Sequence, residues 1–236
     1  MGAVTSYSTS QSMGYPLTNK NIILDLDDTL VNTRESIDTI EQIDLVDPDS
    51  RKRFYSLFLP GDYYHVWGMM RPGCKEFLSF CFDYFDKVII WSAGDDKYVK
   101  SMVERLFEGL PDPDGVFSRQ YCETDGTNTT KPLLKLQPHY PNLDLTNSLI
   151  VDDRDHNSLT CNPDNAVIIP PYTQDDDALY KLMEWLLRPE VRRSSDVRTL
   201  DKTQIFTQPL PRLPFSQSFR TKMVPTIALS REGWST

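Results

Sequence analysis

The chain has 236 residues, of which 39% are hydrophobic and 25% charged, so it has enough apolar side chains for one compact domain with short tails. Its 25 Lys and Arg against 34 Asp and Glu give a formal net charge of −9, which argues against direct binding of nucleic acid. No apolar run approaches the roughly 20 residues of a membrane-spanning helix, and a secretory signal pattern is absent. We therefore expect an intracellular protein, either cytoplasmic or nuclear.

The cysteines and the amino-terminal residues bear on compartment and anchoring. Four widely spaced cysteines form no CxxC pair, and the three histidines show no zinc-binding spacing with them, which indicates a reducing compartment and no structural metal site. Residues 1–6 fit the short pattern for myristoylation of Gly2. Because so short a pattern often arises by chance, we expect membrane association only if Gly2 is acylated. The sequence leaves the oligomeric state open.

Three regions of the chain differ in composition. Residues 1–20 are rich in Ser, Thr and Gly and are expected to form a flexible arm. Residues 21–187 alternate short apolar runs with amphipathic segments, as in a folded domain. Residues 188–236 contain nine Lys or Arg, four Asp or Glu and five Pro, which predicts a basic tail without regular structure. Such a tail could fold back, recruit a partner, contact anionic lipid or have no dedicated role.

The domain is predicted to contain, in chain order, a strand at 21–27, a helix at 72–85, a strand at 87–91, a helix at 95–107, strands at 148–152 and 165–169, and a helix at 175–187. The strands are runs of β-branched and large apolar residues, and the helices begin with Pro, Gly or acidic residues. This alternation predicts an α/β fold, in which central parallel strands of a doubly wound sheet are flanked by helices.

The first predicted strand ends in a group of acidic residues. Asp25 and Asp27 are two residues apart, so their side chains leave the strand on the same face, at the end where such sheets bind ligands. Neighbouring carboxylates repel each other unless a cation lies between them, which indicates either Mg²⁺ or a division into nucleophile and acid. Capping of the next turn by Asp28 or Thr29 would explain one polar residue but not three acids.

Polar residues also follow two later strands. Ser92 precedes a helix start and could bind an anion, although alone it is ordinary turn chemistry. Lys131, taken alone, resembles a solvated lysine. Asp152 and Asp153 end another apolar strand, and a second carboxylate pair beside the first would be destabilising without a divalent ion.

Taken together, these residues resemble the four motifs of the haloacid dehalogenase superfamily, in its phosphatase branch. Further segments resemble the small RNA polymerase II C-terminal-domain phosphatases, also called the NLI-interacting-factor-like family; they are residues 26–31, 70–78, 98, 119–122, 131–133 and 151–153. The resemblance covers about residues 21–187. It implies a haloacid dehalogenase-like, Rossmannoid fold with a small cap or none.

The resemblance also implies a mechanism. Asp25 would attack phosphorus and form an aspartyl-phosphate, and Asp27 would act first as general acid and then as general base. Mg²⁺ would lie between the Asp25 carboxylate, the Asp27 backbone carbonyl and Asp153, with Asp152 nearby or bound through water. The phosphoryl oxygens would be bound by Thr29, Ser92, Ala93 and Lys131.

The implied function is a Mg²⁺-dependent phosphatase acting on phosphoserine or phosphothreonine in a flexible protein segment, with RNA polymerase II tail repeats as the family's best-known substrate. No large cap is expected after Leu30 or Gly94, which leaves room for a polypeptide. Two alternatives are a phosphatase for a small-molecule or lipid phosphate and a non-catalytic module that binds phosphoproteins. Aromatic residues at 54, 55, 63, 64 and 67 are expected in a core or hairpin, and alternatively in a substrate groove.

Overall fold

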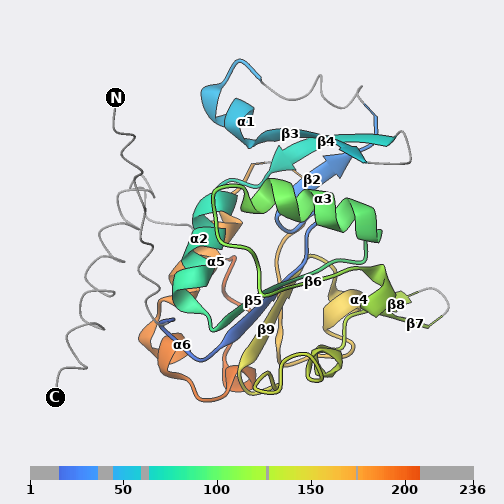
Figure 1. Cartoon of the computed structure of the whole chain (residues 1–236). Coiled ribbons are helices and arrows are strands. Elements are labelled where there is room, and N and C mark those ends of the chain that lie inside the picture. Colours follow the sequence, from blue (N-terminus) through green and yellow to red (C-terminus); the bar gives the residue numbers. More distant parts are fainter. Residues whose placement is uncertain (1–15, 37–44, 60–63, 126–127, 174, 208–236) are drawn as a thin grey trace, which may run out of the picture.

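The computed structural model describes residues 16–36, 45–59, 64–125, 128–173 and 175–207 (Figure 1). The predictions for Gly2 and for residues 208–236 lie outside these residues. The centre of the fold is a five-stranded sheet in the order β10-β9-β1-β5-β6, and every pairing in it is parallel. Its strands are β1 (Asn21–Leu24), β5 (Lys87–Trp91), β6 (Gly115–Phe117), β9 (Ser148–Asp152) and β10 (Ala166–Ile168). The predicted α/β sheet and its four predicted strands are confirmed, and the short β6 adds an edge strand.

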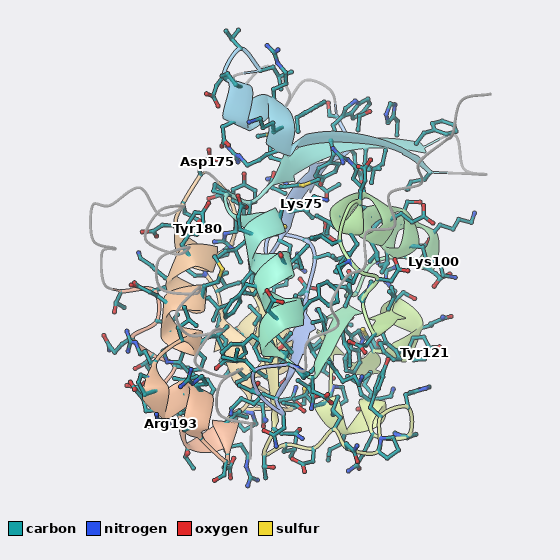
Figure 2. The ribbon with its side chains drawn as sticks, turned by 60° about the vertical axis from the view of Figure 1, so that its left-hand side comes forward. Lys75, Lys100, Tyr121, Asp175, Tyr180 and Arg193 are labelled. Carbon is teal, nitrogen blue, oxygen red and sulfur yellow. The ribbon has the colours of Figure 1, made fainter. Side chains whose placement is uncertain are left out.

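Both faces of the central sheet are buried. Neighbouring residues of each strand point to opposite faces, so they pack into two different apolar clusters. Ile22 and Leu24 lie in the larger apolar cluster, together with residues of α2 (Cys74–Tyr84), α3 (Asp96–Phe107) and α5 (Ala178–Leu186). Ile23 lies in a second cluster, which includes Leu133 of the 3₁₀ helix η3 (Leu133–Leu136). Figure 2 shows α5, which carries Tyr180, alongside α2, which carries Lys75. The sheet is therefore covered on both sides, as predicted.

The helix predicted at 175–187 begins later than expected. Its first residue is Ala178, because Asp175 and Asp176 bind arginine side chains before the helix starts. The helices predicted at 72–85 and 95–107 agree with α2 and α3 to within two residues. In α3 the Asp95 side chain accepts a hydrogen bond from the Lys97 backbone N–H, so Asp95 is the N-cap of the helix.

A small antiparallel sheet is inserted between β1 and α2. It contains β2 (Val31–Arg34), β3 (Phe54–Leu59) and β4 (Tyr64–Met70) in the order β2-β4-β3, and the short helix α1 (Pro48–Arg53) precedes β3. We call β2, β3 and β4 the insertion sheet; it lies above α3 in Figure 1. Its size agrees with the expected small cap. Tyr55 is buried in it, which confirms the core prediction for this residue, whereas Phe54 and Trp67 are half-buried.

The remaining elements connect the central strands on the second face. They are the 3₁₀ helix η2 (Arg119–Tyr121), a hairpin of β7 (Glu123–Asp125) and β8 (Asn128–Thr130), and the short helix α4 (Asp155–Ser158). In Figure 1 the hairpin and α4 lie together at one side of the sheet, opposite α2 and α5. Within the described residues, no helix has the length and apolar character needed to cross a membrane.

The prediction that regular structure ends at residue 187 is wrong. Helix α6 (Pro189–Arg193) and the 3₁₀ helix η4 (Val197–Thr199) follow, and Val191, Val197 and Ile205 are buried in the main core. In Figure 2, α6 with Arg193 lies directly below α5. Three apolar side chains among the charges are sufficient for this segment to pack.

The end of the predicted flexible arm is also ordered. The backbone N–H groups of Leu17 and Thr18 donate to carbonyls at the end of α2, at 2.9 and 3.0 Å. The buried Lys20 ammonium donates to the carbonyl oxygens of Arg192 and Ser194, at 2.9 and 2.8 Å, and so joins this segment to the end of α6. A lysine in this position satisfies carbonyl groups that the helix end leaves open.

Residues 188–207 should therefore contribute to stability. We expect a chain that ends at Leu187 to be less stable than one that ends at Thr207 by at least about 4 kcal/mol, because burial of each aliphatic side chain contributes about 1.5–3 kcal/mol. Urea unfolding followed by circular dichroism measures the difference. Equal unfolding midpoints for the two chains would contradict this packing.

Candidate active site

The acidic residues meet at the carboxyl edge of the three central strands. Asp25 follows β1, Asp152 ends β9, and Ser92 follows β5, and these strands are neighbours in the order β9-β1-β5. The Asp25 N–H donates to the Val151 carbonyl at 3.0 Å, which places the two carboxylates at the same level. Carboxyl ends of neighbouring parallel strands form the usual ligand site of such sheets.

Lys131 joins two of these carboxylates. Its buried ammonium lies 2.5 Å from Asp25 Oδ1 and 2.7 Å from Asp152 Oδ2. The backbone of Lys131 is fixed by Asn157, whose carbonyl accepts from its N–H, and by Asn162, whose side chain donates to its carbonyl. A lone lysine in the sequence, expected to be solvated when taken by itself, is in the structure the central cation of the site.

Burial changes the proton affinity of this group. Burial raises the pKa of Asp25, and the attraction of Lys131 opposes that shift. For Lys131 burial acts to lower the pKa, but the carboxylates of Asp25 and Asp152 raise it above its ordinary value. The lysine is therefore held in the charged form, which is the form that can bind an anion.

Asp25, Asp152 and Asp153 form a cluster that could hold a metal ion. Each offers a carboxylate oxygen, and these atoms lie within 4.8 Å of one another. Asp152 also accepts from the Arg154 N–H and the Ser158 hydroxyl, at 2.9 and 3.1 Å. Asp153 Oδ1 is buried without a hydrogen-bond partner, and burial raises the pKa of Asp153 to about 6. Because Mg²⁺ prefers carboxylate oxygens, an unpartnered buried oxygen here fits a divalent cation.

Asp27 lies in a different environment from Asp25. Its Oδ1 accepts hydrogen bonds from Tyr98 of α3 and, at 2.9 Å, from Thr33 of β2. The Thr33 hydroxyl also lies 2.6 Å from the Tyr98 oxygen and 2.7 Å from the Tyr55 oxygen. Burial raises the pKa of Asp27, while the hydrogen bonds from Tyr98 and Thr33 oppose the shift.

The partners of Asp27 are hydroxyl groups, which can bind its carboxyl group in the charged or the neutral form. Thr33 and Tyr98 both donate to Oδ1, so a proton carried by Asp27 would lie on Oδ2. Asp25 thus faces a cation whereas Asp27 faces hydroxyl groups, and the two carboxyl groups have different surroundings.

The predicted phosphate-binding residues lie in the segments that follow β1, β5 and β8. The buried Ser92 hydroxyl accepts from the Gly94 N–H at 3.0 Å, so its own proton is free to be donated. The Ala93 carbonyl accepts from the exposed Arg119 side chain at 2.7 Å. The Thr29 hydroxyl is buried and has no hydrogen-bond partner within the described structure. The structure thus brings Thr29, Ser92 and Lys131 to the same edge as the acids.

Arg71 supports the turn that carries the acids, and sequence reasoning assigned it no role. Its buried guanidinium donates to the Thr29 and Pro170 carbonyls, at 3.0 and 2.7 Å, and pairs with Asp176 at 2.6 Å. One sequence signal could have pointed to this role. Arg71 stands directly before Pro72 and Gly73 at the start of α2, within the segment 70–78 that resembles the family. In the same turn Asp28 has φ 56, a left-handed conformation that Asp tolerates better than most residues.

Comparison with known proteins identifies the family. Residues 20–198 match the NLI interacting factor-like phosphatase family. The chain belongs to this family. The chain is also similar to the mitochondrial import inner membrane translocase subunit TIM50 of Kluyveromyces lactis. The two are 31% identical over 140 residues, which cover 56% of this chain and 26% of the translocase subunit.

Two solved structures of the RNA polymerase II CTD phosphatase Fcp1 have a similar fold. A fission yeast Fcp1 variant bound to beryllium fluoride has a TM-score of 0.53 and 19% identity, and a second Fcp1 structure has a TM-score of 0.51 and 17% identity. Both similarities cover 92% of this chain, and 65% and 64% of the respective Fcp1 chains. The chain thus spans about a quarter of the translocase subunit and just under two thirds of the Fcp1 chains. The predicted haloacid dehalogenase-like fold and the family resemblance are confirmed.

The Arg71 contacts lead to a stability prediction. Arg71→Met should lower the free energy of unfolding by about 3 kcal/mol, because two carbonyl groups lose their donor and Asp176 loses its buried partner. Arg105→Met, which removes an exposed pair with Glu108, should change it by no more than about 1 kcal/mol. Chemical denaturation compares the two variants. A loss in Arg71→Met no larger than in the control would show that Arg71 does not hold the turn.

Proposed function

We propose that this chain is a Mg²⁺-dependent phosphatase that hydrolyses phosphoserine or phosphothreonine in a flexible protein segment. The observation that carries the proposal is the contrast between the two carboxylates after β1. Asp25 contacts the buried Lys131, and Asp27 contacts the hydroxyl groups of Thr33 and Tyr98. Membership of a phosphatase family and the fold shared with Fcp1 support it.

The reaction has two chemical steps. In the first, a carboxylate oxygen of Asp25 forms a bond to phosphorus while the bond from phosphorus to the serine or threonine oxygen breaks, and Asp27 gives that oxygen a proton. In the second, Asp27 takes a proton from a water molecule, whose oxygen attacks phosphorus. Phosphate then leaves and the Asp25 carboxylate is restored, so that both residues return to their starting state.

Residues of the chain would bind the phosphoryl oxygens during both steps. Lys131 has three N–H donors, and two of them are directed at Asp25 and Asp152, which leaves one for a phosphoryl oxygen. The hydroxyls of Thr29 and Ser92 are buried, and each has a proton to donate. Donors fixed in a buried site stabilise developing negative charge without having to reorganise.

The acidic cluster would hold Mg²⁺ through Asp25, Asp153 and the backbone carbonyl of Asp27, with Asp152 nearby. When bound, the ion would offset the negative charge of the phosphoryl group and the carboxylates. The unpartnered Asp153 oxygen supports this assignment. The insertion sheet is small, which supports a protein segment as the substrate, and RNA polymerase II tail repeats are the substrate class that the Fcp1 relatives suggest.

Hydrolysis of p-nitrophenyl phosphate tests the chemistry. We expect turnover with Mg²⁺, loss of turnover with excess chelator, and a fall in kcat of at least about 10³-fold in Asp25→Asn, because the amide cannot form the phosphoenzyme. Circular dichroism verifies that the variant is folded. Equal activity of the variant and the unchanged chain would refute the nucleophile. A folded, Mg²⁺-loaded chain that binds phosphopeptides but turns over neither them nor aryl phosphates would be a binding module instead.

Titration calorimetry tests the metal site without relying on catalysis. Asp153→Asn should weaken Mg²⁺ binding at least about tenfold, since even groups that only support a metal ligand contribute that much. Asp155→Asn is the matched control, because Asp155 is exposed and lies outside the cluster. Equal Mg²⁺ affinity in Asp153→Asn and the control would place the ion elsewhere.

A further inference from the structure

We infer that Thr33 and Tyr55, two hydroxyl side chains of the insertion sheet, are positioning residues for Asp27. They fix its Oδ1 atom and so leave Oδ2 to exchange the proton with the leaving group. The inference rests on the proposed function, because it gives the insertion sheet a part in the acid–base chemistry of the same site. The two residues come from β2 and β3, whereas Asp27 follows β1 in the central sheet.

The contacts around Asp27 are one-sided. Thr33 and Tyr98 both donate to Oδ1, and within the described structure Oδ2 has no hydrogen-bond partner. A carboxyl group on a short turn can rotate, and rotation would exchange the two oxygens. Two donors from different elements, β2 and α3, oppose that rotation because each fixes the same atom from its own direction. The oxygen that remains can then face the reacting group.

Tyr55 in turn fixes Thr33. The Tyr55 hydroxyl is buried and lies 2.7 Å from the Thr33 hydroxyl, its only hydrogen-bond partner in the described structure. A buried hydroxyl without a partner is costly, so this contact holds both side chains in one arrangement. Thr33 therefore cannot rotate away from Asp27 without leaving Tyr55 unpaired.

A glycine makes the contact between the two strands possible. Gly68 of β4 is in register with Thr33 on one side and with Tyr55 on the other. A Cβ atom at Gly68 would lie 2.4 Å from the Tyr55 oxygen and 2.2 Å from the Asn32 carbonyl oxygen. Only a residue without a side chain lets the Tyr55 hydroxyl cross the middle strand to Thr33. The pattern Thr33–Gly68–Tyr55 is thus one unit of the insertion sheet.

The test compares aryl phosphates with good and poor leaving groups. The ratio of kcat/KM for p-nitrophenyl phosphate to kcat/KM for phenyl phosphate measures the need for an acid, because p-nitrophenolate leaves readily without a proton. General acid catalysis contributes about 10²–10⁴-fold, so partial loss of positioning in Tyr55→Phe or Thr33→Val should raise this ratio about tenfold. Thr33→Ser, which keeps the hydroxyl, should restore the ratio.

Tyr84→Phe is the matched control for Tyr55→Phe. Tyr84 is also a buried tyrosine, but its hydroxyl donates to the Leu186 carbonyl, away from the site. The Tyr84→Phe variant should therefore have the same ratio of the two kcat/KM values as the unchanged chain. If Tyr55→Phe and Thr33→Val have an unchanged ratio while Asp27→Asn raises it, the positioning role is wrong and the proposed function stands. If Asp27→Asn also leaves the ratio unchanged, Asp27 is not the acid and the inference is wrong with it. Absence of any turnover in the unchanged chain would instead refute the proposed function.

Discussion

The site depends on burying several carboxylates together at one edge of the central sheet. Asp25 and Asp152 are nearly or fully removed from water, and transfer of an isolated charge into such surroundings costs several kcal/mol. Lys131 offsets part of that cost, and it can do so only because Asn157 and Asn162 hold its backbone beside the strands. Asp153 Oδ1 is buried without a hydrogen-bond partner, while the exposed Arg154 lies 3.9 Å from the other oxygen, and this open carboxylate oxygen is why the geometry favours a divalent ion. Sheet order, lysine and acids are therefore parts of a single electrostatic constraint.

Asp25 and Asp27 lie at the same edge of the sheet but have different contacts. Asp25 and Asp27 leave one strand end two residues apart, and burial raises the pKa of both. What differs is the partner: an ammonium stabilises a carboxylate, whereas hydroxyl groups can pair with a neutral carboxyl. The surroundings of the two acids are thus set by the side chains that contact them and not by the sequence distance between them. Lys131, which directly follows β8, contacts Asp25, and Thr33 of β2 contacts Asp27.

Much of this architecture could be predicted from the sequence because parallel strands obey simple rules. Apolar strands that end in acids place those acids at one edge, whichever strands are neighbours. Thr33 and Tyr55 could not be predicted, because their contact depends on the register of two antiparallel pairings through Gly68. The order of residues 189–205 was missed because their charges, and the four prolines at 209–225, obscured three apolar side chains that the core accommodates. The late start of α5 could not be predicted either. Asp175 and Asp176 pair with Arg53 and Arg71, which are more than 100 residues away in the sequence.

The insertion sheet and the turn at residues 25–30 form one closed structure. Strand β2 begins at Val31, directly after the turn, and its first residue pairs with Met70 at the end of β4. The next residue, Arg71, donates its backbone N–H to Leu30 and its side chain to Thr29, so the chain leaves the turn and returns to it within one small sheet. These bonds at one end of the sheet, together with the contacts of Thr33 with Asp27 and Tyr98, oppose movement of the sheet away from the turn. A protein segment that binds against it would meet a surface in fixed register with Asp25 and Asp27, and a small insertion can thereby orient a polypeptide without closing over it.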